Sequence, residues 1–208
     1  MLEIKNVHKT FNKGTINEKK ALNGVDLKLQ PGDFVTVIGG NGAGKSTMLN
    51  MIAGVYPIDQ GTILLDGKDI SDLPEYKRAY MLGRVFQDPM MGTAAGMEIQ
   101  ENMAMAYRRG KRRGLSWGIT KKEKKMFKEK LATLDLGLEE RMTSKVGLLS
   151  GGQRQALTLL MATLKKPSLL LLDEHTAALD PKTAKKVLDL TEKIVAKDNL
   201  TTLMVTHN

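Results

Sequence analysis

A glycine-rich loop that follows a short apolar stretch constrains this chain more than any other feature. The apolar stretch covers residues 34–38, and the loop at residues 39–47 fits the pattern G-x-x-x-x-G-K-[ST]. In proteins with this pattern a buried parallel strand leads into the loop, and a helix begins where the loop ends. At average composition such a match arises by chance in a chain of this length with a probability of about one per cent. The pattern therefore predicts a strand, a phosphate-binding turn and a helix, in that order.

The residues of this loop have distinct expected roles. Glycines let backbone N–H groups approach phosphate oxygens, and the helix that follows adds the positive end of its dipole. Lys45 is expected to reach the β and γ phosphates, Ser46 to bind magnesium, and Thr47 to support the α phosphate. The expected nucleotide-binding residues of the loop are Gly39, Asn41, Gly42, Ala43, Gly44, Lys45, Ser46 and Thr47.

Length and composition limit the class of protein. A chain of 208 residues can form one domain with a large insertion. Because it has no cysteine, it has neither disulfides nor a thiolate metal site, which suits the cytoplasm. The N-terminus has no signal-peptide core, and the longest aliphatic run, at residues 169–172, is far shorter than the roughly 18 residues of a membrane span. Any role at a membrane is therefore expected to depend on a partner.

The net charge of +9 is partly concentrated in two basic clusters, at residues 108–113 and 121–125. Such clusters are most often solvated helix faces, although nucleic acid or anionic lipid headgroups remain alternatives. With four Phe, four Tyr and one Trp, the chain has too few aromatic residues to suggest a base-stacking platform. We therefore expect solvated faces and no nucleic-acid partner.

Two kinds of strand are expected. Alternating apolar and polar residues indicate a small antiparallel sheet, and short, fully apolar runs indicate parallel strands buried on both faces of an α/β core. The alternating stretches are residues 2–11, 21–29 and 61–70. The apolar runs are residues 34–38, 81–86, 169–172 and 202–206.

No such strand is expected between Asp88 and Lys166. This segment instead has helical spacing of its apolar residues, which predicts a mostly helical insertion. The expected helices cover residues 97–109, 121–134 and 151–165.

Two carboxylates follow the apolar run at residues 169–172. Asp173 is expected to hold magnesium through water, and Glu174 to accept a proton from the attacking water or to orient it beside the γ phosphate. The alternative is a buried strand followed by a solvated turn. The upstream Lys45 favours the catalytic interpretation.

A second helix start lies at residues 149–153, Leu-Ser-Gly-Gly-Gln. Ser150 and Gln153 have the spacing of a capping box, which is a purely structural explanation. Capping does not explain Gly151 and Gly152, because a glycine in a helix costs up to about 1 kcal/mol relative to alanine. Glycine there lets a phosphate come close.

These residues resemble the nucleotide-binding domains of ABC transporters, whose signature motif residues 149–153 match at all five positions. The resemblance implies an α/β fold of the P-loop NTPase class, with a RecA-like parallel core, an N-terminal antiparallel β-subdomain and an inserted α-helical subdomain. It implies one domain over residues 1–208, with the core at 1–87 and 166–208 and the helical subdomain at 88–165. Family members continue further, so the resemblance also implies a shortened C-terminal end.

The resemblance assigns roles to four further residues. Gln87 resembles the glutamine that senses magnesium and the attacking water, and His207 the histidine that contacts the γ phosphate. Asp180 resembles the D-loop aspartate and also fits an N-cap before a proline at the first helical position. Phe11 takes the place of the ring that stacks on adenine, with a core phenylalanine as the alternative.

With these roles, the expected site residues form three overlapping sets. The expected catalytic residues are Glu174, His207, Gln87 and Lys45. The expected Mg2+ ligands are Ser46, Gln87 and Asp173. Beyond the loop, the expected ATP contacts are Phe11, Gln87, Ser150, Gly151, Gly152, Gln153 and Asp180.

This sequence departs from the usual pattern of the family at Gly40 and at His175, where proline is common. Neither departure removes a phosphate ligand or the catalytic base. His175 could change the response to pH.

The resemblance also implies how such a chain works. Two copies bind head to tail, so that Ser150 and Gly152 of one copy complete the γ-phosphate shell of ATP on Lys45 of the other. The expected partners are a second copy, an integral membrane permease and a solute-binding protein, at the cytoplasmic face of the plasma membrane. The sequences of these motifs most resemble those in ATPases of bacterial uptake systems provisionally assigned to tryptophan, tyrosine or related amino acids.

Two alternatives stay open at this stage. One is an ABC-type ATPase that acts on nucleic acid or the ribosome, which the charge of +9 would suit. The other is a nucleotide-binding regulator without turnover, which Glu174 and His207 argue against.

Overall fold

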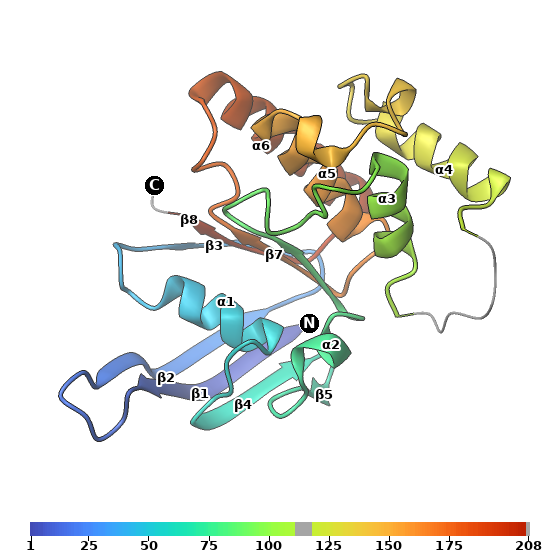
Figure 1. Ribbon diagram of the computed structural model, residues 1–208. Helices are drawn as coiled ribbons and strands as arrows, with labels where there is room; N and C mark the ends of the chain where they lie inside the picture. The colour runs from blue at the N-terminus through green and yellow to red at the C-terminus, as the bar shows by residue number, and fades with distance from the viewer. Residues whose placement is uncertain (111–117, 207–208) are drawn as a thin grey trace. The chain divides into compact units, whose positions relative to one another are not determined.

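The chain forms two compact units in a computed structural model that describes residues 1–110 and 118–206. The first unit contains Met1–Gly83, Pro167–Glu174 and Asn199–Asn208, of which 207 and 208 lie outside the described residues. The second contains Arg84–Lys166 and His175–Asp198. Figure 1 shows the elements of both units in chain order. The expected boundaries of the helical subdomain, between residues 87 and 88 and between residues 165 and 166, stay a prediction.

An antiparallel sheet begins the first unit, as the alternating pattern predicts. Its strand order is β2-β1-β4-β5, and Figure 1 shows β1, β2 and β4 side by side. On β1, Leu2 and Ile4 point into the core because alternate side chains of a strand face opposite ways. The strands are β1 (Leu2–Phe11), β2 (Lys19–Leu29), β4 (Gln60–Leu65) and β5 (Lys68–Asp69).

The second sheet has the order β3-β8-β7-β6. Strand β8 pairs in parallel with both β3 and β7, which confirms the predicted parallel core. The four apolar residues of β7 before Asp173 are fully buried. The strands are β3 (Phe34–Ile38), β6 (Leu82–Val85), β7 (Leu169–Asp173) and β8 (Thr202–Thr206).

Strand β3 is not buried on both faces, and that prediction was wrong. Phe34 is 43% exposed and Ile38 is 65% exposed. Within the described residues β3 is an edge strand, paired only with β8. An apolar run alone does not distinguish an edge strand from a central one, because the number of neighbouring strands is set by the topology.

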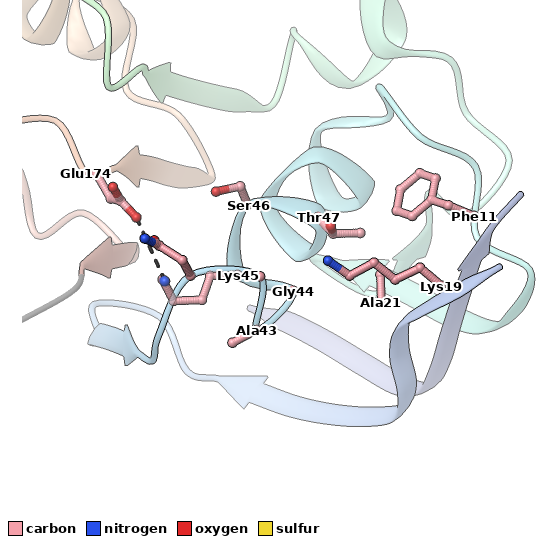
Figure 2. Close-up of a pocket in the computed structure, with 11 residues that line it drawn as sticks. Phe11, Lys19, Ala21, Ala43, Gly44, Lys45, Ser46, Thr47 and Glu174 are labelled. Atoms are coloured by element: carbon pink, nitrogen blue, oxygen red, sulfur yellow. Dashed lines mark ion pairs between the residues drawn. The ribbon is translucent and has the colours of Figure 1, made fainter. Parts of the chain in front are cut away.

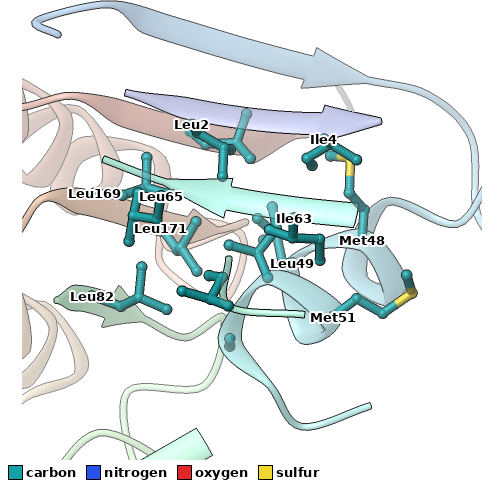
Figure 3. Packing of buried hydrophobic residues seen from close by; sticks show 14 of the residues in the cluster. Leu2, Ile4, Met48, Leu49, Met51, Ile63, Leu65, Leu82, Leu169 and Leu171 are labelled. Carbon is teal, nitrogen blue, oxygen red and sulfur yellow. The ribbon is translucent and has the colours of Figure 1, made fainter. Parts of the chain in front are cut away.

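The core of the first unit lies between the antiparallel sheet and helix α1 (Lys45–Ala53). Figure 3 shows Leu2 from β1, Leu49 from α1 and Ile63 from β4 pointing into one shared apolar region. Burial of each such Leu or Ile side chain stabilises the folded chain by about 1.5–3 kcal/mol relative to leaving it exposed. This packing holds α1, and with it the end of the glycine-rich loop, in place.

A buried arginine binds the C-terminal end of α1. Arg78 of helix α2 (Glu75–Arg78) donates hydrogen bonds to the carbonyl oxygens of Met51 at 2.6 Å and of Ile52 at 3.0 Å. These carbonyls belong to the last turn of α1, where N–H donors from a following helical turn are absent. The Met51 carbonyl also accepts from the N–H of Gly54 at 3.1 Å, so the Arg78 side chain adds to the backbone cap at this end of the helix.

The second unit is helical, as predicted. Within its described residues between Asp88 and Lys166 there is no strand, only an isolated bridge of Glu98 with Lys145. Its apolar core includes Ile99, Phe127 and Leu157. The helices are α3 (Ile99–Tyr107), α4 (Lys121–Ala132), the short 3-10 turns η1 (Leu138–Glu140) and η2 (Val146–Leu148), α5 (Gly151–Thr163) and α6 (Pro181–Asp198).

The two basic clusters differ in their surroundings. In the cluster at residues 121–125 all four lysines are exposed on the first turns of α4, as expected for a solvated face. In the other cluster Arg108 forms an ion pair with Glu123 at 2.9 Å, and residues 111–113 lie outside the described residues. None of the helices that the structure describes is both long and apolar enough to span a membrane.

Candidate nucleotide-binding site

The glycine-rich loop connects β3 to α1, as the sequence predicts. Gly44 is the N-cap of α1 and has a φ of 88°. A Cβ atom at this position would lie 2.4 Å from the carbonyl oxygen of Ala21 on β2. Only glycine therefore fits there, and the first N–H groups of α1, with the positive end of its dipole, border the cavity described below.

The geometry of the site begins with a buried lysine. Lys45 donates hydrogen bonds from Nζ to the carbonyl oxygens of Gly39 at 2.7 Å and Gly40 at 3.1 Å. The same Nζ lies 3.9 Å from a carboxylate oxygen of Glu174, and both side chains are less than 10% exposed (Figure 2). The structure thus brings together the expected phosphate-binding cation and the expected base.

Two side-chain oxygens, from Ser46 and Asp173, lie next to this pair. The hydroxyl of Ser46, in the first turn of α1, donates to a carboxylate oxygen of Asp173 at 3.4 Å. Asp173 is the last residue of β7. Hydroxyl and carboxylate oxygens at this separation fit two positions around one hard divalent cation. No cluster of three or more His, Cys, Asp or Glu side chains able to hold a metal occurs among the described residues.

Glu174 adopts an uncommon backbone conformation. It follows β7 with a φ of 45°, a region that residues other than glycine seldom adopt. Its N–H donates to the carbonyl oxygen of Val205 on β8 at 3.0 Å, which fixes the turn. Such conformations cost about 1–3 kcal/mol and cluster at functional sites. The strain therefore supports a functional role for this residue.

A cavity of about 170 Å³ lies over the loop. It is lined by Phe11, Lys19, Ala21, Asn41, Gly42, Ala43, Gly44, Lys45, Ser46, Thr47 and Glu174. Lys19 and Ala21 were missed by the sequence analysis, because nothing in a strand pattern says which loop the strand will border. Gly39 is not part of the lining but binds Lys45 through its carbonyl.

Phe11 lies at the edge of this cavity rather than in the core. Its ring packs edge-on against Tyr56, with ring centroids 5.3 Å apart. The ammonium of Lys9 lies 5.6 Å from the centre of the Phe11 ring. Phe11 is half-buried and is not among the residues of the apolar core. A planar base could therefore reach its remaining exposed surface.

Apart from His207, the remaining expected residues belong to the second unit. Gln87 is exposed in a bend just after β6. The preceding residue, Phe86, accepts a hydrogen bond at its carbonyl oxygen from Nε2 of Gln155, a fully buried residue of α5. This contact links α5 to the Gln87 bend. It could not be predicted, because a buried glutamine has no sequence pattern of its own.

At the start of α5 the structure contains the capping box that the sequence analysis weighed as an alternative. Ser150 accepts a hydrogen bond from the backbone N–H of Gln153, whose side chain accepts from the backbone N–H of Ser150 at 3.1 Å. A Cβ atom on Gly152 would lie 2.2 Å from a methyl carbon of Thr183. Gly152 therefore has a packing reason to be glycine, and the approach of a phosphate stays a prediction.

Asp180 caps α6, as its position before Pro181 predicts. Its carboxylate accepts a hydrogen bond from the backbone N–H of Thr183 at 3.0 Å. The hydrogen bonds from Thr183 lower the pKa of Asp180. The N-cap role is thus present. His207 comes directly after β8 and lies outside the described residues.

His175, where the family commonly has proline, is buried in the second unit. Its Nε2 lies 3.1 Å from the hydroxyl oxygen of Thr191 on α6, and that hydroxyl donates to the carbonyl of Val187 at 2.8 Å. Since the only hydroxyl proton is used, Nε2 must be the donor to Thr191. Burial lowers the pKa of His175 to about 4.

A glycine loop at a helix N-terminus, a buried lysine and a Ser–Asp pair beside a strand-end glutamate define a P-loop nucleoside-triphosphate site. Residues 22–177 match the ABC transporter family. The chain belongs to this family, and it is an ATP-binding, ATP-hydrolysing subunit of a transport system. The predicted fold class is confirmed.

The chain is similar in sequence to named ATP-binding proteins of transport systems. The chain is 45% identical over 208 residues to a tyrosine transport ATP-binding protein of Clostridioides difficile, covering all of this chain and 82% of the relative. It is 35% identical to the methionine import ATP-binding protein MetN of Clostridium acetobutylicum, covering all of this chain and 61% of that protein. These relatives take part in the transport of amino acids.

Solved structures agree with the fold. The chain is similar to MJ0796, a bacterial ABC transporter cassette solved as a dimer, with a TM-score of 0.83 and 32% identity over all of this chain and 88% of that one. The same cassette has been solved as a dimer in a post-hydrolysis state bound to ADP and Pi, again with a TM-score of 0.83.

Proposed function

We propose that this chain powers the uptake of tyrosine or a related amino acid. The support is the full-length similarity to a tyrosine transport ATP-binding protein, together with weaker similarity to methionine import proteins. The residues that select a solute belong to other subunits, so the proposal depends on this similarity and not on the nucleotide site.

ATP and Mg2+ are the proposed ligands of the site. The proposed Mg2+ ligands are Ser46, Gln87 and Asp173. In support, the Ser46 and Asp173 oxygens lie 3.4 Å apart at the helix N-terminus. Mg2+ usually keeps few protein ligands and takes the rest from water and substrate phosphates, which suits so small a set. The ion would neutralise charge on the phosphate oxygens.

Hydrolysis would use the Lys45–Glu174 pair. Glu174 accepts a proton from the attacking water, whose oxygen forms a bond to the γ phosphorus while the bond from that phosphorus to ADP breaks. Lys45 exchanges its hydrogen bonds to the loop carbonyls for bonds to β and γ oxygens, where it stabilises the developing charge. His207 would contact the γ phosphate. The observation that carries this proposal is the 3.9 Å separation of the Lys45 and Glu174 side chains at the end of β7.

A second copy of the chain would complete the site. Small-molecule pockets usually enclose about 300–1,000 Å³, whereas the cavity over the loop has about 170 Å³. One copy therefore encloses only part of a nucleotide. In the proposed head-to-tail dimer Ser150, Gly151, Gly152 and Gln153 of the other copy cover the γ phosphate, and Asp180 lies at the same interface. The dimeric structures of MJ0796 support this arrangement.

The motion of such a dimer would act on a membrane permease at the cytoplasmic face of the plasma membrane. Met90 and Met91, next to Gln87, are 58% and 68% exposed. Exposed methionines suit an adaptable docking surface. A solute-binding protein would deliver the amino acid, and the helical subdomain at residues 88–165 would carry the docking surface and the signature motif.

Glu174→Gln tests the mechanism. The variant is expected to bind ATP with unchanged affinity and to lose about a hundred- to ten-thousandfold in hydrolysis, the usual contribution of a positioned base. Phosphate release measures hydrolysis, titration with a fluorescent ATP analogue measures affinity, and light scattering in the presence of ATP and Mg2+ measures dimerisation. Hydrolysis at the wild-type rate would remove Glu174 from its role, and an absence of ATP-dependent dimers in this variant would contradict the head-to-tail assembly.

Transport of the solute needs a separate test. The chain, reconstituted with its permease and binding protein in vesicles, is expected to move labelled tyrosine when ATP is supplied on the side of the chain. Preferred uptake of methionine over tyrosine and tryptophan would contradict the proposed solute. The nucleic-acid alternative gains no support from the relatives, and salt-dependent binding of RNA or DNA at physiological ionic strength would revive it.

A further inference from the structure

Lys19 occupies a position on β2 that faces the nucleotide cavity. In the pairing of β1 with β2, Phe11 lies directly opposite Lys19, and Thr10 lies opposite Lys20. Directly paired residues of neighbouring strands point to the same face of a sheet, and successive residues point to opposite faces. Lys19 therefore shares a face with Phe11, the expected adenine contact, and Lys20 points the other way.

The end of β2 also borders the phosphate loop. The carbonyl oxygen of Ala21 would lie 2.4 Å from a Cβ on Gly44. The ammonium nitrogen of Lys19 would lie 3.4 Å from a Cβ on Gly42. Figure 2 shows the Lys19 side chain running from its strand towards the loop, on the side of Thr47. The ammonium thus lies in the cavity wall, between the Phe11 ring and the loop.

Within the part of the chain that the structure describes, the ammonium of Lys19 has no hydrogen bond or ion pair. The nearby Lys9 differs, because it is buried and pairs with Asp59 at 2.9 Å. Among the described residues that line the cavity, Glu174 is the only acidic one, and it lies beside Lys45. A second ammonium in the same small cavity favours binding of an anion, since two cations near each other repel unless an anion lies between them.

We propose that Lys19 is a further nucleotide-binding residue, which contacts the phosphate chain of ATP between the base on Phe11 and the terminal phosphates on Lys45. This inference rests on the proposed nucleotide site. Lys19 adds a contact from the antiparallel sheet, which contains neither the glycine-rich loop nor the signature motif. The ligand chemistry is a purine nucleoside di- or triphosphate. Since ADP retains the inner phosphates, the contact should serve both ATP and ADP.

The chain offers a matched control for the test. Lys19→Gln removes the charge in the cavity, and Lys20→Gln removes the same charge from the neighbouring residue on the opposite face. Lys19→Arg restores a cation of similar reach. Affinities of all four proteins, including the wild type, are measured by titration with fluorescent ATP and ADP analogues at low and at physiological salt.

Lys19→Gln is expected to weaken the binding of both nucleotides by about 5- to 20-fold, the range for one partly solvated charge-assisted hydrogen bond. It should also reduce the dependence of affinity on salt. Lys20→Gln should stay within about twofold of the wild type, and Lys19→Arg should recover most of the loss.

Affinity of Lys19→Gln within about twofold of the wild type, or an equal loss in Lys20→Gln, would overturn the inference. An equal loss would indicate a general effect of net charge. If the wild type itself binds neither nucleotide, the proposed nucleotide site fails, which is a different result from a failure of Lys19 alone.

Discussion

Protonation of His175 should make this protein less stable in mild acid. The imidazole is 2% exposed and donates from Nε2 to Thr191. Its pKa in the folded chain is lowered to about 4, against about 6.5 for an exposed histidine. The unfolded chain therefore binds a proton at higher pH than the folded chain does. Stability is fully present above about pH 6.5 and falls as the pH drops towards about 4.

The size of the effect follows from the two pKa values. With about 6.5 unfolded and about 4 folded, the free energy of unfolding falls by about 1 kcal/mol at roughly pH 6 and by about 2 kcal/mol at roughly pH 5. Below about pH 4 the loss levels off near 3 kcal/mol, because both states are then protonated. These values apply to His175 alone, and carboxylates add their own effects.

His175→Gln isolates this contribution, because the glutamine amide can donate to Thr191 and does not titrate. Urea unfolding of both proteins between roughly pH 7.5 and 5 should show that the wild type loses about 2 kcal/mol more than the variant. As a control, His8→Gln changes a histidine that lies at the surface beside Asn6. Parallel stability curves for wild type and His175→Gln would refute the reasoning.

Two further substitutions test the site and its support. Gly44→Ala should lower the free energy of unfolding by about 1–3 kcal/mol and weaken ATP binding, because Gly44 has a positive φ and its Cβ would meet the carbonyl of Ala21. Gly40→Ala is the control. Nothing lies within 4 Å of its Cβ position, so it should have little effect on urea unfolding. Equal midpoints for the two variants would contradict this account. Gln155→Leu removes the side-chain donor to the Phe86 carbonyl and should lower kcat for ATP hydrolysis, with less than a twofold change in ATP affinity. Gln100→Leu, which changes another buried glutamine, is the control. A kcat of Gln155→Leu equal to that of the wild type would exclude a positioning role.

The sequence predicted the elements that follow local patterns. The loop before Lys45, the capping box at Ser150 and the N-cap at Asp180 depend on residues within a few positions of each other, and all three are present. The alternation of β1 and the apolar run of β7 likewise predicted the two sheets.

Features that depend on distant residues were not predictable. The exposure of Phe34 follows from the number of strands beside β3, and the contact of Gln155 with Phe86 joins residues 69 positions apart. The place of Lys19 beside the loop needs the register of β2 on β1, in which one residue of slip would move Lys20 into the cavity instead. No local pattern contains that register.

The capping box at the start of α5 has a consequence for how fast two copies would meet. Since Ser150 and Gln153 already satisfy each other's backbone groups in a single copy, the first turn of this helix is ordered before any ligand or second copy arrives. Association would then cost rigid-body freedom and little loop ordering. Its rate would depend on diffusion and orientation, with no local folding step to slow it.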